Sequence, residues 1–321
     1  MTTSTPVVRP SSVSTLASSG RFGGAVGPAV GFSALLALSG PAAGEAYADS
    51  LCATDDRDRE VCLPVPAGRI AALSPGATEL VYAAGAGDQV VAVVDYSDYP
   101  PQAQAVPSLG SHTRIDMERL VALRPTLVIG WVTGNPSEQL EMLEALGLPV
   151  FYLEPRSFEG VASAIERLGR LAGTADAADR EARRFRDGMI ELRERYAGRA
   201  PVRVFYQVWD EPLMTVNDAH LIGSVLTACG GVNVFGDLER LVPRIGDESV
   251  LDADPEAILA GGMGEESREW LTHWEQYTNL TAVAEGNLFF VPPSLIQRPT
   301  PRLLEGSRLF CEKLEAARAR R

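Results

Sequence analysis

The chain has 321 residues, of which 45% are hydrophobic and 22% are charged, so it can bury one large core or two smaller ones without metals or dense disulfides. Its 42 acidic residues outnumber 29 basic ones and give a formal net charge of -13, which argues against a phosphate-backbone partner. We therefore expect a globular protein that does not bind nucleic acid.

The N-terminal segment has the order of a secretory signal. No charged residue falls between Arg21 and Glu45, and an apolar run precedes the small-residue site Ala46-Tyr47-Ala48. This order predicts a signal peptide over residues 1–48, cleaved near Asp49, and an exported, soluble mature protein.

Two kinds of membrane anchor are the alternatives for this segment. The uncharged stretch is long enough to span a bilayer, but its Gly, Ser and Pro content disfavours a permanent anchor. A lipid anchor on Cys52 would need an aliphatic residue three positions earlier, where Asp49 stands.

Four cysteines in an exported chain indicate disulfides, and they allow three connectivities. Cys52 and Cys62 bracket a segment that can turn a hairpin between two short strands, so a bridge there would staple that hairpin. Cys229 and Cys311 are then left for each other, which would tie the C-terminal helix to its lobe. Buried free thiols are the alternative for each pair.

After Arg69 the chain alternates short apolar runs with segments of helical periodicity, which predicts an α/β fold with largely parallel sheets. The predicted strands cover residues 69–73, 90–94, 126–131, 150–153, 202–208, 257–260 and 288–291. The predicted helices between them cover residues 78–84, 117–123, 137–146 and 158–172.

One segment differs, because residues 175–197 contain no proline and carry apolar residues at helical spacing along a charged sequence. Such a helix would be about 30 Å long, enough to cross from one domain to another. We expect a lobe over residues 49–174, a linking helix over 175–198 and a second lobe over 199–321.

A short pattern occurs on both sides of this helix. Glu118 begins a predicted helix that ends at Pro125, and Glu248 begins one that ends at Pro255 with the same spacing; each is followed by a strand. The repeat favours two lobes of similar topology that face each other across a cleft.

Catalytic signatures are missing from the sequence. We find no phosphate-binding loop, no Gly-x-Ser-x-Gly elbow, no His-Glu-x-x-His and no full dinucleotide fingerprint. The chain has only three histidines, so a cleft enzyme would depend on carboxylates such as Asp210 and Glu211. We expect a protein that is not an enzyme.

Several short motifs are spread over most of residues 55–315. They are 96–101 (YSDYPP), 109–110 (LG), 118–125 (ERLVALRP), 131–135 (WVTGN), 203–207 (RVFYQ), 229–235 (CGGVNVF) and 298–302 (RPTPR). Together they resemble the cobalamin branch of the periplasmic binding proteins that serve ABC-type importers.

This resemblance implies a fold and a function. The fold would be two Rossmann-like lobes joined by one long helix, which is a class III periplasmic binding protein with its ligand cleft between the lobes. The function would be capture of a corrinoid, cobalamin or cobinamide, by a periplasmic monomer without a cofactor of its own. Its partner would be an inner-membrane ABC permease with a cytoplasmic ATPase. A haem or ferric-siderophore binding protein of the same class is the alternative.

The resemblance also implies the ligand-binding residues. Aromatic rings suit a corrin because the macrocycle is a flat, partly apolar disc. The matching or substituted positions are Tyr96, His112, Trp131, Trp209, Val242, Ser294 and Arg298. Among them His112, Val242 and Ser294 depart from the family pattern, which places the exact ligand in question.

His112 has a second reading, since an imidazole close to a corrin or haem could coordinate its cobalt or iron. Glu118 and Glu248 match acids that meet permease arginines in this family, so the resemblance implies that they dock the permease. An acid in a first helical turn also favours the helix dipole, which is the alternative for both glutamates.

Overall fold

The computed structural model describes residues 51–262, 264 and 268–321. The predicted signal peptide lies outside the described residues. In the described part of the chain, no helix is both long and apolar enough to cross a membrane.

The first sheet consists of four parallel strands in the order β4-β3-β7-β8. The strands are β3 (Ile70–Ala72), β4 (Val90–Ala92), β7 (Leu127–Trp131) and β8 (Val150–Leu153). Their sequences are nearly all apolar because helices cover both faces of the sheet. Helices α1 (Pro75–Ala83) and α4 (Phe158–Ala172) pack on one face, and α2 (Met117–Ala122) and α3 (Ser137–Ala145) pack on the other.

The second sheet repeats this design with four parallel strands in the order β10-β9-β11-β12. The strands are β9 (Val202–Gln207), β10 (Gly231–Asn233), β11 (Ala257–Ala260) and β12 (Leu288–Phe290). Helices α6 (Leu221–Ala228) and α11 (Leu303–Arg318) contribute to the core on one face. Helices α7 (Asp247–Ala253), α8 (Glu269–Trp274) and α9 (Thr281–Ala284) form the core of the other face.

Small elements complete the described chain. Two antiparallel hairpins pair β1 (Leu51–Thr54) with β2 (Glu60–Leu63) and β5 (Gly110–Ser111) with β6 (Arg114–Ile115). The short helices are η1 (Gly87–Gln89), η2 (Pro101–Ala105) and α10 (Pro293–Ile296).

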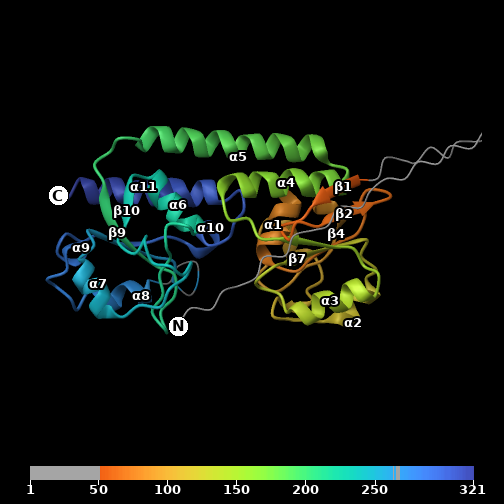
Figure 1. Cartoon of the computed structure of the whole chain (residues 1–321), viewed down its shortest axis with the longest axis horizontal. Coiled ribbons are helices and arrows are strands. Elements are labelled where there is room, and N and C mark those ends of the chain that lie inside the picture. Colours follow the sequence, from red (N-terminus) through yellow and green to blue (C-terminus); the bar gives the residue numbers. More distant parts are fainter. Residues whose placement is uncertain (1–50, 263, 265–267) are drawn as a thin grey trace, which may run out of the picture. The chain divides into compact units, whose positions relative to one another are not determined.

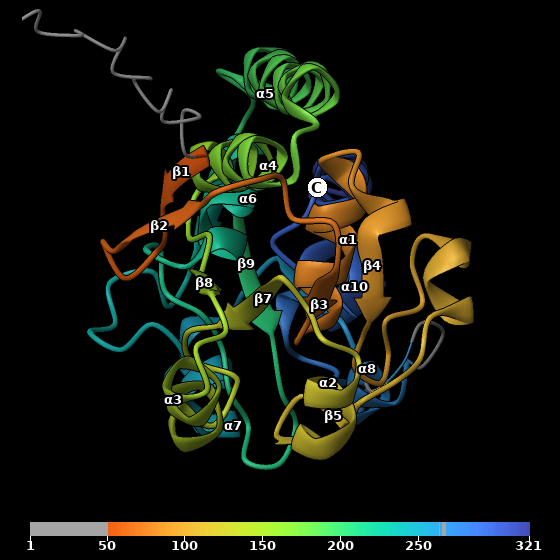
Figure 2. The same cartoon turned by 90° about the vertical axis from the view of Figure 1, so that its right-hand side faces the viewer.

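The predicted long helix is α5 (Ala175–Tyr196), which packs along α4 and also contacts α11 (Figures 1 and 2). Its buried stripe includes the apolar positions that set the helical period in the sequence, such as Phe185 and Leu192. Its single glycine, Gly188, faces Leu304 of α11, and a Cβ there would lie 2.4 Å from Leu304 Cδ2. The glycine therefore permits the close approach of α11 to the connecting helix.

Both predicted disulfides are present. Cys52 and Cys62 are opposed residues of the β1–β2 hairpin, with Cα atoms 4.1 Å apart. Cys229, at the end of α6, joins Cys311 of α11 across a Cα–Cα distance of 4.8 Å, and both are fully buried. The second bridge fastens the C-terminal helix to the second lobe, as the sequence predicts.

Candidate functional site

A cavity of about 580 Å³ is lined by residues from both lobes. The first lobe contributes loops that follow the carboxyl ends of β3, β7 and β8, which is where parallel α/β sheets place their ligands. The second lobe contributes the loop after β9, the start of α6 and the segment from α10 to Pro299. We call this cavity the cleft.

Trp131 and His112 form an aromatic wall on the first-lobe side of the cleft, with ring centroids 5.6 Å apart. Asn135, which is 7% exposed, holds both residues by their backbones. Its Oδ1 accepts the Trp131 N–H at 2.7 Å, and its Nδ2 donates to the carbonyls of His112 at 2.9 Å and Leu73 at 2.8 Å. A Cβ on Gly134 would lie 1.9 Å from the Trp131 indole, so this glycine leaves room for the ring.

Tyr96 and Trp209 add two more aromatic side chains that are open to solvent, at 80% and 44% exposure. Tyr96 adopts a positive φ of 64°, an uncommon conformation for a residue with a side chain. The Trp209 indole donates its Nε1–H to the Glu211 carbonyl at 3.0 Å and meets Trp270 edge to face.

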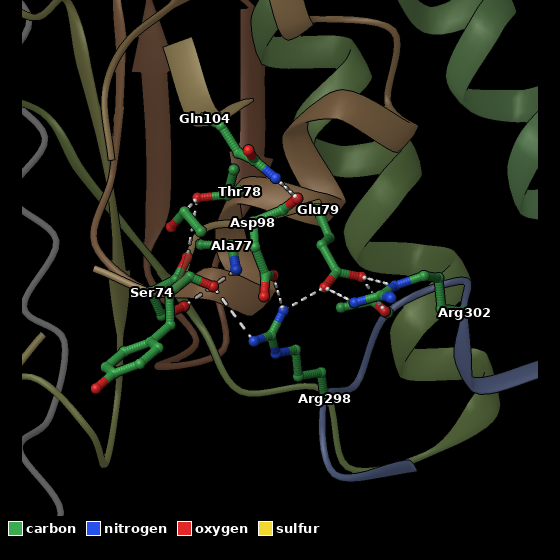
Figure 3. A network of polar contacts seen from close by, with 11 residues as sticks. Ser74, Ala77, Thr78, Glu79, Asp98, Gln104, Arg298 and Arg302 are labelled. Atoms are coloured by element: carbon green, nitrogen blue, oxygen red, sulfur yellow. Dashed lines mark hydrogen bonds and ion pairs between the residues drawn. The ribbon is translucent and has the colours of Figure 1, made fainter. Parts of the chain in front are cut away.

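Arg298 lines the cleft, but its guanidinium already donates hydrogen bonds to other residues of the protein (Figure 3). Nη1 donates to Glu79 at 2.9 Å and to Asp98 at 2.8 Å, and Nη2 donates to the Tyr96 carbonyl at 3.2 Å. Burial opposes the charge on Arg298, yet the bonds to Asp98 and Glu79 raise its pKa above the ordinary arginine value.

Glu79, on α1, is 3% exposed and accepts several hydrogen bonds from the segment around Arg298. Arg302 donates Nε and Nη2 to its two oxygens at 3.0 and 2.8 Å, and Thr300 donates its hydroxyl at 2.7 Å (Figure 3). This buried ion pair joins the first lobe to the chain segment that leads into α11.

The remaining residues expected at the site divide into two groups. Ser294 lines the cleft and is 6% exposed, whereas Val242 does not line it and its neighbour Leu241 does. The carboxylates Asp210 and Glu211 also lie outside the cavity lining, and Asp210 accepts a hydrogen bond from Gln207.

Arg156 and His220 are among the polar cleft residues that sequence reasoning missed. His220 accepts the Ile222 N–H on its Nδ1 at 3.1 Å and thereby caps α6. Burial, and then the charge of Arg156, lower the pKa of His220 to about 4, so the ring is neutral at pH 7. Arg156 lies three residues after the end of β8, and that position beyond a strand's carboxyl end could have indicated its role.

A second cavity, of about 800 Å³, is lined by residues of α1, α5 and α11. Its charged lining mixes both signs, with Glu79, Asp88, Glu181 and Glu305 beside Arg184, Arg302 and Arg308. Although this cavity is larger and is lined by two tyrosines, the tryptophan and histidine side chains lie in the cleft, which is therefore the candidate binding site.

Two parallel α/β lobes, one long connecting helix and a cleft between the lobes define a class of extracytoplasmic binding protein. Residues 70–295 match the family described as Periplasmic binding protein, and the chain belongs to this family.

Curated relatives match most of this chain, and the matched region covers most of their own length. The chain is 35% identical to the vitamin B12-binding protein of Vibrio cholerae serotype O1 over 254 residues, which cover 79% of this chain and 91% of that protein. It is 34% identical to the vitamin B12-binding protein of Yersinia pestis over 253 residues, covering 78% and 88%.

Solved structures agree with this family assignment. The crystal structure of the periplasmic vitamin B12 binding protein BtuF of Vibrio cholerae matches with a TM-score of 0.71 and 34% identity, over 79% of this chain and 98% of that one. The periplasmic heme-binding protein RhuT from Roseiflexus has a TM-score of 0.70 over 78% and 99%, but its 22% identity supports the fold alone.

Proposed function

We propose that this chain is the substrate-binding component of an ABC importer and captures a cobalamin-like corrinoid in the cleft. The observation that carries the proposal is the aromatic lining of the cleft by Trp131, His112, Tyr96 and Trp209 in a chain 35% identical to a vitamin B12-binding protein. A corrin ring is broad and flat, so stacking and apolar burial supply most of its binding free energy.

We propose that the chain is a binding protein and not an enzyme. Support comes from the family, whose members here are binding proteins, and from the position of Asp210 and Glu211 outside the cleft lining. We propose a periplasmic monomer with lobes over residues 49–174 and 199–321 and a linker over 175–198. The bounds of α5 support the position of the linker.

His112 lines the cleft and could present a ring nitrogen to a metal. Within the described residues, neither of its ring nitrogens has a hydrogen-bond partner, and the ring lies against Trp131. An imidazole with unbonded ring nitrogens can contact the ligand or coordinate its cobalt. The same feature favours a haem protein as the second candidate function, with iron as the metal.

Titration of purified protein with cyanocobalamin, cobinamide and haemin tests the proposal, read by calorimetry and absorbance. We expect one-to-one binding of a corrinoid at micromolar concentration or tighter. Binding of haemin with no corrinoid binding would replace the leading function by the second one.

Glu118 and Glu248 are the proposed contacts for the permease. Each is the second residue of its helix, α2 or α7, and each is exposed without a hydrogen bond or ion pair in the described structure. Figure 1 shows both helices on the side of their sheets away from α5. Equivalent acids on two similar lobes suit the two equivalent halves of a dimeric permease.

Charge reversal tests this docking surface. We expect Glu118→Arg/Glu248→Arg to abolish ligand-stimulated ATPase activity of the reconstituted permease, because both new charges would face the basic patches the acids are proposed to meet. Glu191→Arg/Glu312→Arg, two reversals at exposed acids of α5 and α11, is the control. Normal stimulation by the first double variant, with corrinoid affinity intact, would show that the permease docks elsewhere.

A further inference from the structure

Arg156 places a positive charge on the wall of the cleft. It lies in the loop between β8 and α4 and is exposed, and within the described residues no oxygen accepts a hydrogen bond from it. Its neighbour Glu154 is bound to Thr133, whose N–H and hydroxyl donate to one carboxylate oxygen at 3.1 and 2.9 Å. Arg298, which also lines the cleft, is held by Glu79 and Asp98. The guanidinium of Arg156 is therefore left for a ligand.

His220 lines the same cavity from the second lobe, and only its Nε2 can donate a hydrogen bond there. Because its Nδ1 accepts the Ile222 N–H, the neutral ring carries its proton on Nε2. Nε2 has no partner in the described structure. The lowered pKa, about 4, has Arg156 as its second cause, so the two side chains are near enough for the arginine's charge to act on the ring.

We infer that Arg156 and His220, one from each lobe, form a subsite for an anionic group of the ligand. An arginine supplies charge and paired donors to an oxyanion, and a neutral Nε2–H supplies one directed hydrogen bond. This inference rests on the proposed corrinoid function, and it identifies the group as the phosphodiester of the nucleotide arm. That phosphodiester is ionised at neutral pH, whereas the amides on the corrin rim are uncharged. The subsite thus selects complete corrinoids over cobinamide, which has neither the phosphate nor the nucleotide base.

Three ligands separate the phosphate from the rest of the molecule. Cyanocobalamin has phosphate and base, cobinamide phosphate has the phosphate without the base, and cobinamide lacks both. Their dissociation constants are measured by calorimetry for the wild-type protein, Arg156→Gln and His220→Asn. Asparagine at 220 keeps an acceptor for the Ile222 N–H and removes the Nε2 donor. Arg180→Gln, an exposed arginine on α5 outside both cavities, is the matched control.

We expect Arg156→Gln to weaken cyanocobalamin and cobinamide phosphate by about 10-fold to 100-fold and cobinamide by less than about twofold. His220→Asn should follow the same pattern with a smaller loss, and Arg180→Gln should change none of the three constants. Equal weakening of all three ligands by Arg156→Gln, or no weakening, would overturn the anion subsite while the proposed function stands. Failure of the wild-type protein to bind any corrinoid would remove the proposed function, and this inference with it.

Discussion

Asn135 shows how one buried side chain can set the shape of the cleft. It holds the backbones of Trp131 and His112 together and ties both to the end of β3 through the Leu73 carbonyl. The sequence motif that contains Trp131 and Asn135 indicated the tryptophan as a candidate. The partners of the asparagine could not be predicted, because they come from two other loops.

Asn135→Asp should therefore weaken both the fold and the site. The aspartate keeps an acceptor for the Trp131 N–H but replaces two donated hydrogen bonds with an oxygen facing two carbonyls. We expect a loss of about 2 to 4 kcal/mol in the free energy of unfolding, measured by urea denaturation, and weaker corrinoid binding. Asn279→Asp, on an exposed loop, is the control. Equal stability of the two variants would mean that the hydrogen bonds of Asn135 contribute little.

His220 predicts a specific pH dependence of stability. Its pKa is about 4 in the folded protein and near 6.5 when unfolded, so between these values the unfolded chain binds more protons. Stability from this residue is complete above about pH 6.5 and is lost as the pH falls toward 4.

Between pH 7 and pH 5 the loss from His220 should be about 2 kcal/mol. His220→Asn keeps the helix cap but cannot titrate, so its unfolding free energy should fall less over this interval. Urea denaturation of both proteins at pH 5, 6 and 7 measures the difference. Parallel stability curves for the two proteins would contradict the lowered pKa.

At the scale of elements, the sequence predicted the parts with strong patterns. Nearly all residues of the predicted apolar strands β7, β8 and β11 are buried. The apolar residues that repeat at helical spacing in α5 are buried as well. The sequence left β10 and α6 unassigned. β10 has three residues beginning with glycine, and α6 is apolar nearly all round, so neither shows a clear period. The two-residue strands β5 and β6 are too short for any pattern.

The ion pairs of Glu79 join α1 to the segment before α11, and no sequence pattern pairs residues so far apart. Glu79→Gln leaves Arg298 and Arg302 with less of the charge that compensates them in a largely buried site. We expect a loss of about 3 kcal/mol in the free energy of unfolding, measured by urea denaturation. Glu138→Gln, exposed on α3, should change it by less than about 0.5 kcal/mol. A similarly small effect at Glu79 would show that the network does not stabilise the fold.

At the scale of the whole molecule, the sequence could predict two α/β lobes joined by a helix, because the connecting helix and the repeated strand-helix units are local patterns. The repeated pattern on both sides of the connecting helix already indicated a cleft, but the residues of its walls could be reached only through the resemblance, since they come from distant parts of the described chain. Arg156 and His220 belong to no recognisable motif, and their proposed anion subsite depends on the way the two lobes come together.

A titration of Trp131→Ala with cyanocobalamin tests most directly whether the cleft holds a corrinoid against the aromatic wall. Loss of the indole should cost about 1 to 3 kcal/mol of binding free energy, roughly a 5-fold to 150-fold rise in Kd. Tyr82→Ala, which alters the second cavity instead, should leave Kd unchanged. An unchanged Kd for Trp131→Ala, or a rise for Tyr82→Ala alone, would contradict the account.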